Sequence, residues 1–282
     1  MLLCRIMYIL THRGLEPSNK HFFAESSFDA FKDHLERGFG IEFDLNFIKN
    51  NQIIITHDID LAHITSNKNT KSRLCSFEEL MNLIRQNSSH INALHFKGGF
   101  QKQIYIDVLL DLLKKYTNDL IDRIIFFDIK SETAKRMKSK MAGLHLAPSV
   151  AHLYDIERFN SFVGGTMISI EEAIKYKKKG LYDWVWLDEW DQTDKNGKIK
   201  KFYNRENFKK LRSIGYKIAL VTPELHGTSP GLLGNENHPD AKPPKKLFGR
   251  IKEIINLNPD VICTDYPEEV LKLKSFKKKS KS

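Results

Sequence analysis

Two histidines and two carboxylates stand in three short motifs near the start of the 282-residue chain. In order, the motifs are His12-Arg13-Gly14, Glu42-Phe43-Asp44 and His57-Asp58. Carboxylate oxygens bind hard divalent cations such as Mg²⁺ or Ca²⁺, and such a cation neutralises charge on a phosphate. Two imidazoles can move protons at the attacking and leaving oxygens. These residue types therefore predict metal-dependent hydrolysis of a phosphodiester.

The elements that must position these motifs recur along the chain as apolar runs of strand length, each followed by a stretch of helical periodicity. This alternation predicts a parallel sheet, and the chain length suits one (β/α)8 barrel, which commonly needs roughly 250 residues. We therefore predict a single-domain α/β TIM barrel. Its eight strands are expected at Arg5–Thr11, Phe39–Leu45, Ile91–Lys97, Arg123–Ile129, Gly143–Ala147, Trp184–Leu187, Lys217–Val221 and Val261–Thr264.

Helix signals lie between these strands. Ser27–Arg37 places apolar residues on one face and ends at Gly38, and Ser76 with Glu79 forms a capping box for the next helix. Other helices are expected at Lys102–Tyr116, Ile170–Lys179, Arg205–Ile214 and Lys246–Asn256. Two polar segments, Asn46–Arg73 and His226–Lys245, follow strands and should lie on the face where active sites of barrels are built.

In such a barrel the three motifs converge. His12 follows the first strand and His57 lies in the loop after the second. Glu42 and Asp44 alternate along the second strand, so their side chains project to the same side. Two imidazoles would thereby flank a pair of carboxylates at the carboxyl ends of the strands.

The motifs closely resemble those of the glycerophosphodiester phosphodiesterase family. The matching text is His12-Arg13-Gly14, Ala24-Glu25-Ser26-Ser27 before Ala30-Phe31, Ile41-Glu42-Phe43-Asp44, and His57-Asp58 with Leu61 and Thr65. The ending Thr264-Asp265-Tyr266-Pro267 also matches the family's eighth strand. The resemblance is dense near the N-terminus and recurs near the C-terminus, so it covers both ends of the barrel.

The resemblance implies a role for each matching residue. His12 and His57 would be the catalytic pair, and Arg13 would contact the phosphate. Glu42 and Asp44 would bind the metal, with Glu25 supporting the site. Lys97 matches a lysine of the family's third strand, and we expect it to contact the substrate.

The third strand also departs from the family pattern. The family usually has Asn-x-Glu-x-Lys there, with Glu as the third metal ligand, whereas this chain has His95 at that position. Imidazole binds transition metals but is a poor ligand for Mg²⁺ or Ca²⁺. The expected cofactor is therefore Mg²⁺ or Ca²⁺ if an acid such as Asp128 completes the site, and Mn²⁺ or Zn²⁺ if His95 is a ligand.

Further candidates follow later strands. A divergent branch of the family has Asn or His at the third-strand position, and this chain matches its later segments at Phe126-Phe127-Asp128, Trp186-Leu187-Asp188 and Pro223-Glu224-Leu225-His226-Gly227. We expect Asp128 to complete the metal site, with Asp188, Glu189 and Glu224 as alternatives. Glu224 is expected to contact substrate, and Trp190 could stack on a ligand.

Composition limits the remaining possibilities. The formal net charge is +10, and the segment 271–282 holds six lysines and no acid, so the remainder carries 10 − 6 = +4. We therefore divide the chain into a barrel domain, 1–270, and a basic C-terminal tail, 271–282. From its charge we expect this tail to be solvated or to make weak contact with an anionic membrane. No sequence feature predicts binding to a specific nucleic acid.

The location expected for the protein is the cytoplasm. Cys4, Cys75 and Cys263 are an odd number without close spacing, which disfavours a disulfide framework or a zinc site. The apolar start leads directly into His12-Arg13-Gly14, so we interpret it as the first strand. No later stretch approaches the roughly 20 apolar residues of a membrane span.

Two other functions stay open from the sequence. An enzyme similar to sphingomyelinase D shares the two histidines and the Glu-x-Asp motif, although those proteins resemble secreted chains with disulfides. A barrel that binds an anionic ligand without cleaving it is the second alternative, because the third metal carboxylate is missing. The alcohols of a small-molecule diester and the oligomeric state are not predicted.

Overall fold

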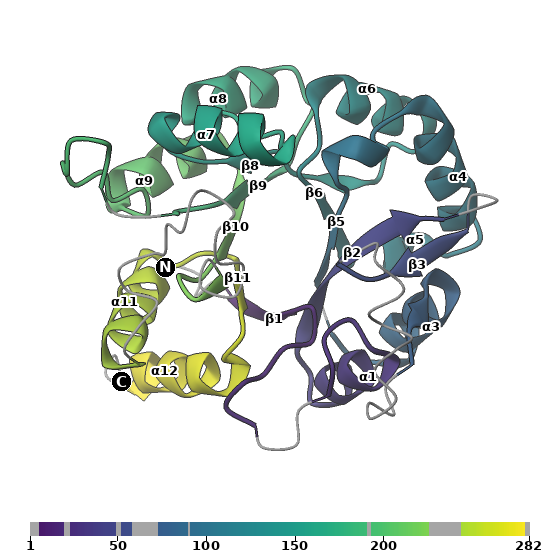
Figure 1. Cartoon of the computed structure of the whole chain (residues 1–282), viewed down its shortest axis with the longest axis horizontal. Helices are drawn as coiled ribbons and strands as arrows, with labels where there is room; N and C mark the ends of the chain where they lie inside the picture. Colours follow the sequence, from purple (N-terminus) through teal and green to yellow (C-terminus); the bar gives the residue numbers. More distant parts are fainter. Residues whose placement is uncertain are drawn as a thin grey trace.

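The computed structural model shows helices arranged around a barrel of strands (Figure 1). It describes residues 6–19, 23–48, 52–57, 73–89, 91–190, 193–225 and 244–279. Strands and helices alternate along most of the chain, except where β2, β3 and β7 are followed by another strand. The predicted α/β barrel is therefore confirmed.

The barrel wall consists of parallel strands in the order β7-β6-β5-β2-β1-β11-β10-β9-β8. The two ends of this order, β7 and β8, are one segment of chain separated by two residues, so the sheet closes on itself through them. The wall strands are β1 (Tyr8–His12), β2 (Gly40–Phe47), β5 (Asn92–His95), β6 (Ile124–Phe127), β7 (His145–Leu146), β8 (Ser149–Val150), β9 (Trp184–Leu187), β10 (Lys217–Val221) and β11 (Val261–Thr264).

The fifth strand of the barrel differs from its predicted form because Pro148 interrupts it. The Ala147 N–H donates to the carbonyl of Phe126 on one side, whereas the Pro148 carbonyl accepts from Trp186 on the other. Proline has no N–H to continue a ladder, so the chain changes partners there. The expected strand Gly143–Ala147 is consequently the short strand β7, and the barrel wall continues after the proline in β8, beyond the predicted end.

Helices cover the outside of the barrel (Figure 1). Ser27 caps the first of them, and the predicted capping box of Ser76 and Glu79 is present at the start of another. The helices are α1 (Phe28–Glu36), α3 (Phe77–Gln86), α4 (Gln103–Leu113), α5 (Asn118–Ile121), α6 (Ser131–Lys140), α7 (Leu153–Val163), α8 (Ile170–Lys178), α9 (Arg205–Ser213), α11 (Pro244–Leu257) and α12 (Pro267–Lys279), with a short 3₁₀ turn η2 (Gly98–Phe100).

Three features were not expected from the sequence. Strand β2 extends into an antiparallel ribbon with β3 (Ile53–Ile55), which pairs with β4 (Cys75–Ser76). Helices α5, α6 and α7 were not predicted; α5 is only four residues long, and α6 has Ala134 and Met137 as its apolar residues, which gives a weak periodic signal. Helix α12 continues past residue 270, so the basic segment begins within a helix.

Apolar side chains fill two layers. One layer lies between the barrel and its helices, and the other fills the barrel interior, where small residues such as Ala93 and Ala219 accommodate the bulky Trp184 and Trp186. This interior layer forms the floor beneath the carboxyl ends of the strands. Within the described residues, no helix is long and apolar enough to cross a membrane.

Candidate active site

A cavity of about 600 Å³ opens at the carboxyl ends of the barrel strands. All three sequence motifs reach it, and the residues of these motifs that line it are His12, Arg13, Glu42, Asp44 and His57. Pockets of about 300–1,000 Å³ are typical of small-molecule sites. The structure thus brings the predicted chemical groups into one cavity.

The strand register explains this convergence. His12 lies opposite Glu42 in the β1–β2 pair, and Asp44 lies opposite His95 in the β2–β5 pair. Side chains of paired residues in neighbouring strands point to the same face. The register therefore places the first histidine, the two carboxylates and His95 side by side.

The turn after β1 depends on two unusual backbone conformations. Arg13 and Gly14 both have positive φ, at 54° and 72°. A Cβ at Gly14 would lie 2.8 Å from the Cβ of Ala30, so only glycine fits against helix α1. The glycine lets the turn pack closely and directs Arg13 toward the carboxylates.

Asp44 is the centre of the polar contacts. Its Oδ1 lies 2.7 Å from Nδ1 of His95 and 3.7 Å from Nζ of Lys97. Its Oδ2 lies 3.4 Å from Nε of Arg13. Burial alone would raise the pKa of Asp44, but the hydrogen bond from His95 and the charges of Lys97 and Arg13 hold that pKa well below its usual range.

The pKa of Glu42 shifts in the opposite direction to that of Asp44. Burial, followed by the negative charge of Asp44, raises the pKa of Glu42 to about 8. The pair therefore holds one firmly ionised carboxylate and one that accepts a proton near neutral pH. A bound cation would favour the ionised form of both.

His95 lies between two acids. Its Nδ1 contacts Asp44, and its Nε2 is 3.5 Å from Oδ2 of Asp128. Burial lowers the pKa of His95, but hydrogen bonds to Asp128 and Asp44 outweigh it and raise the pKa to about 9. Asp128 also accepts a hydrogen bond of 2.5 Å from Oγ1 of Thr166. His95 thus links the predicted metal ligands Asp44 and Asp128.

The donor set suits a divalent cation. One ligand atom each from Glu42, Asp44 and His95 lie within 4.8 Å of one another. Among the described residues, Glu42 Oε2 and Asp44 Oδ2 are buried and accept no hydrogen bond. A buried carboxylate oxygen that accepts no hydrogen bond is costly, and a cation would contact both oxygens, in addition to the Arg13 guanidinium near Asp44 Oδ2. Asp128 is not in this cluster, so its predicted role as a ligand stays a prediction.

A second group that could hold a metal, Glu16, Asp33 and His34, lies elsewhere. Both carboxylate oxygens of Glu16 accept hydrogen bonds from Arg37, at 2.6 and 2.9 Å. The guanidinium already balances the charge of this carboxylate. The cavity cluster is therefore the better metal candidate.

His12 is held by a residue from the other end of the chain. Its Nδ1 lies 3.0 Å from Oδ1 of Asp265, which follows β11. Glu224 supports this aspartate, because its Oε1 accepts hydrogen bonds from the Asp265 N–H and from the hydroxyls of Thr222 and Thr264. A carboxylate on Nδ1 fixes the orientation of an imidazole and leaves Nε2 for chemistry.

The partner of His12 was not identified from the sequence. Asp265 was part of the matching text Thr264-Asp265-Tyr266-Pro267, and an acid just after a barrel strand is a signal that could have found it. Glu224, the predicted substrate contact, does not line the cavity among the described residues. Its contacts instead place it beneath Asp265, and its predicted role in substrate binding stays a prediction.

The other predicted residues have varied positions. Lys97 lines the cavity and donates to the backbone carbonyl of His57. Asp188 and Trp190 also line it, whereas the Glu189 carboxylate binds Arg250. Oε2 of Glu25 lies 3.6 Å from Nη1 of Arg13. Asp58, Leu61, Thr65 and His226 lie outside the described residues.

No protein-family model matches this sequence, and no curated protein sequence matches it either. Solved structures do match. A glycerophosphoryl diester phosphodiesterase from Parabacteroides distasonis superposes with a TM-score of 0.64 at 16% identity, over 98% of this chain and 88% of that one. A candidate glycerophosphodiester phosphodiesterase from Galdieria sulphuraria gives 0.65 at 17% identity, over 96% and 99%.

A third similar structure carries a ligand. It is a phosphodiesterase from Oleispira antarctica in complex with the product sn-glycerol-3-phosphate, with a TM-score of 0.61 at 14% identity, over 96% of this chain and 97% of that one. All three similarities extend over nearly the whole chain. The protein described here therefore has the (β/α)8 fold of solved glycerophosphodiester phosphodiesterases.

Proposed function

We propose that this protein is a divergent glycerophosphodiester phosphodiesterase that hydrolyses a phosphodiester to an alcohol and a phosphomonoester. The observation that carries the proposal is the cavity in which His12 and His57 accompany two carboxylates and two basic side chains, Arg13 and Lys97. The glycerol-3-phosphate in the Oleispira antarctica structure supports a glycerophosphodiester as the substrate.

Glu42 and Asp44 would hold the metal ion, with His95 or Asp128 as the third ligand. When bound, the ion would neutralise negative charge on the phosphate oxygens. Oxygen ligands alone favour Mg²⁺ or Ca²⁺, whereas an imidazole ligand favours Mn²⁺ or Zn²⁺. Because His95 contacts Asp44 and Asp128 through both ring nitrogens, its use as a ligand requires loss of a proton.

Arg13 and Lys97 would bind the phosphate. Both are near Asp44, so their positive charges are already held at the polar end of the cavity. A guanidinium offers a planar fork of N–H donors to phosphate oxygens, and an ammonium acts as a point charge. Electrostatic stabilisation by such groups is strongest in a cavity that excludes water.

The two histidines would divide the proton transfers. One takes a proton from the attacking group or attacks directly, and the other protonates the leaving alkoxide. His12 is oriented by Asp265 through Nδ1, which leaves Nε2 to meet the substrate. His57 follows the β2–β3 ribbon, and Lys97 donates to its carbonyl at 2.5 Å.

The test is hydrolysis of bis(p-nitrophenyl) phosphate, with and without EDTA, by the wild type and by His12→Ala. We expect release of p-nitrophenol that EDTA abolishes and that the variant reduces. A barrel that only binds an anion would release none. A mass-spectrometric panel of glycerophosphocholine, glycerophosphoethanolamine and polymer-linked glycerol phosphates would then identify the alcohols, and a cyclic phosphate product would favour the sphingomyelinase D-like alternative.

The proposal also covers the location of the protein and its contact with membranes. We place the protein in the cytoplasm, with a small-molecule substrate and weak contact between segment 271–282 and anionic membranes. In helix α12 the side chain of Lys272 is exposed, whereas Lys274 donates to the backbone carbonyl of Met7. Sedimentation with vesicles that contain phosphatidylserine, compared with a chain truncated after residue 270, would test the membrane contact.

A further inference from the structure

The cavity has a polar arc and an apolar arc. Its histidines and basic groups come from β1, β2, β5 and the segments that follow them. On the opposite side, β6, β9, β10 and helix α7 supply mostly aromatic and aliphatic groups, namely Phe127, Phe159, Trp186, Trp190, Val221 and Leu225. Asp128 and Asp188 are the acids on that side that line the cavity in the described part of the chain. A phosphate bound at the polar arc would therefore face an apolar wall.

The floor of the apolar arc is a stack of three rings. The ring of Phe127 is parallel to that of Trp186, with centroids 3.9 Å apart and planes 11° apart. On its other side the same ring stacks on His95 at 4.8 Å and 12°. Both faces of Phe127 are therefore covered, so the stack joins the apolar arc directly to the polar cluster.

The side wall consists of Trp190 and Phe159, whose ring centroids are 5.2 Å apart. Trp190 is only 5% exposed, and it packs with Ala151 and Met167. A Cβ at Gly165 would lie 2.2 Å from Cε1 of Phe159, so the ring lies directly against the backbone there. These contacts hold both rings in place without a ligand.

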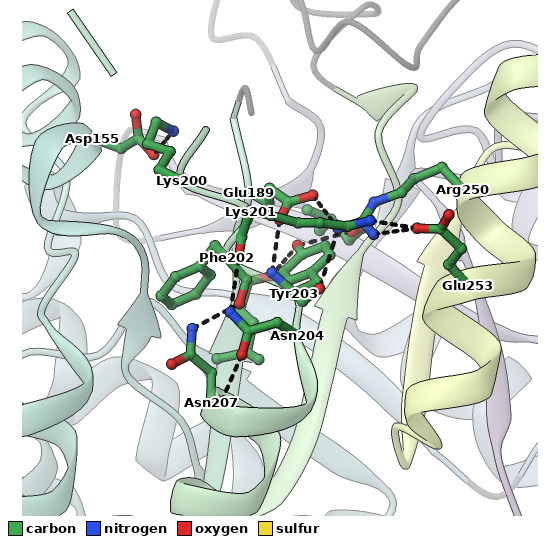
Figure 2. Close-up of polar contacts among 12 residues, drawn as sticks. Asp155, Glu189, Lys200, Lys201, Phe202, Tyr203, Asn204, Asn207, Arg250 and Glu253 are labelled. Atoms are coloured by element: carbon green, nitrogen blue, oxygen red, sulfur yellow. Dashed lines mark hydrogen bonds and ion pairs between the residues drawn. The ribbon is translucent and has the colours of Figure 1, made fainter. Parts of the chain in front are cut away.

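Two buried ion pairs, both drawn in Figure 2, stabilise the segments that carry Phe159 and Trp190. Nζ of Lys200 lies 2.6 Å from Oδ2 of Asp155, and Asp155 is on α7 one turn before Phe159. Arg250 lies 2.7 Å from Glu189, the residue before Trp190. In both pairs the side chains are at most 3% exposed. The wall is therefore anchored to α7 and to α11 by charged groups that face away from the cavity.

The segment 200–203 connects the two ion pairs. Lys200 binds α7, and three residues later the Tyr203 N–H donates to the Glu189 carboxylate at 2.7 Å (Figure 2). The Tyr203 hydroxyl reaches the carbonyls of Leu187 and Val221 on β9 and β10. Binding to a wall that is already ordered costs less conformational entropy than binding to a mobile one.

The stacked rings offer an ammonium group little open aromatic face, and the carboxylate of Asp128 already lies 3.5 Å from Nε2 of His95. A cation is attracted to the face of an aromatic ring, whereas the ring edge carries positive partial charge. The faces of Phe127 are covered by its neighbours, and one face of Trp186 is covered by Phe127. Apolar burial does not depend on ring orientation, so an alkyl chain gains from this surface.

We propose that the apolar arc binds an unbranched alkyl group joined to the substrate phosphate through one ester oxygen. The residues that contact this group are Trp186 of the floor, Trp190 and Phe159 of the side wall, and Leu225. This inference rests on the proposed phosphodiesterase function, because it takes the phosphate to lie at the polar arc. The substrate class is then a phosphodiester with one polar alcohol and one alkyl alcohol.

The test uses methylphosphinates, which carry the single negative charge of a phosphodiester but have no ester bond to cleave. Calorimetry would compare the hexyl, 3-hydroxypropyl and 2-(trimethylammonio)ethyl compounds on the full chain with Mg²⁺ or Mn²⁺. We expect the hexyl compound to bind at least about tenfold more tightly than the hydroxypropyl compound, since each buried methylene adds to affinity. Trp190→Ala and Phe159→Ala should each bring this ratio toward one.

Leu153→Ala is the matched control. Leu153 is on the same helix as Phe159, it is 68% exposed, and it does not line the cavity. It should keep the wild-type ratio. If Trp190→Ala fails to fold, Gly165→Ala provides a second variant, because its Cβ would displace the ring of Phe159.

The outcomes separate the two proposals. Equal affinity for the hexyl and hydroxypropyl compounds, preference for the ammonium compound, or no binding of the hexyl compound would overturn the alkyl site. Tight hexyl binding without hydrolysis of any phosphodiester would instead overturn the proposed function. Hydrolysis without alkyl preference would leave the proposed function standing and remove the alkyl site.

Discussion

Nδ1 of His12 lies 3.0 Å from Oδ1 of Asp265, although 253 residues separate them in the sequence. Both side chains are buried, and parallel pairing of β1 with β11 brings them together. The aspartate can hold the proton of the imidazole on Nδ1 and so direct Nε2 to the substrate. This pair connects the first and last strands of the sequence and orients a predicted catalytic group at the same point.

Asp265→Asn should lower kcat by roughly 10²-fold or more with a small change in KM, because an amide does not hold the imidazole in one tautomer as a carboxylate does. Steady-state hydrolysis of bis(p-nitrophenyl) phosphate would measure it. Asp183→Asn is the matched control, since Asp183 binds His145 at 2.5 Å outside the cavity. An unchanged kcat in Asp265→Asn would remove the orienting role.

His12→Ala and His57→Ala should each lower kcat on a natural diester by roughly 10²–10⁴-fold, the usual contribution of general acid or base catalysis. A leaving group of low pKa such as p-nitrophenolate needs little protonation, so it should partly rescue only the variant that lacks the acid. Comparing the two variants on both substrates would assign the roles. Near wild-type rates for both would contradict the two-histidine mechanism.

Glu42→Gln and Asp44→Asn should abolish binding of Mn²⁺ measured by calorimetry, because each removes an ionised oxygen from the cluster. Glu16→Gln, in the cluster that Arg37 balances, should leave binding unchanged. His95→Glu restores the carboxylate expected in the family at that position and should shift preference from Mn²⁺ toward Mg²⁺. Equal Mn²⁺ affinity in all variants would place the metal elsewhere.

The buried acids Glu224 and Asp265 should make stability depend on pH. Burial and the neighbouring Asp265 raise the pKa of Glu224 to about 7, and burial raises that of Asp265 to about 7 against the lowering effect of Arg13. The folded state then binds more protons than the unfolded state between the ordinary and the raised pKa values. Stability from this pair is present below about pH 4 and is lost as pH rises through 7.

Glu224→Gln should flatten this dependence by up to about 1.4 kcal/mol per pH unit for each proton no longer taken up. Urea unfolding from pH 5 to 8 with EDTA, to keep cations from the Glu42 site, would measure the difference from wild type. Glu36→Gln, at an exposed position on α1, should leave the curve unchanged. Parallel curves for wild type and Glu224→Gln would show that the pair does not titrate in this range.

The sequence by itself determined the architecture and the chemical content of the site. Strands β9, β10 and β11 have the predicted bounds, because short apolar runs between helical segments are specific for buried parallel strands. His12, Glu42, Asp44 and His57 were found because a motif in a fixed order along βα units leads to one face of a barrel. These signals are local in the chain, so they can be detected without coordinates.

Only the tertiary structure decided which groups meet across the barrel. The register between β2 and β5 places His95 against Asp44, and the parallel pairing of β1 with β11 places Asp265 against His12. The aromatic wall likewise joins Phe159 of α7 to Trp190 after β9, braced from α11 through Arg250. These contacts depend on strand register and on helix packing between residues distant in sequence, which composition and periodicity do not encode locally.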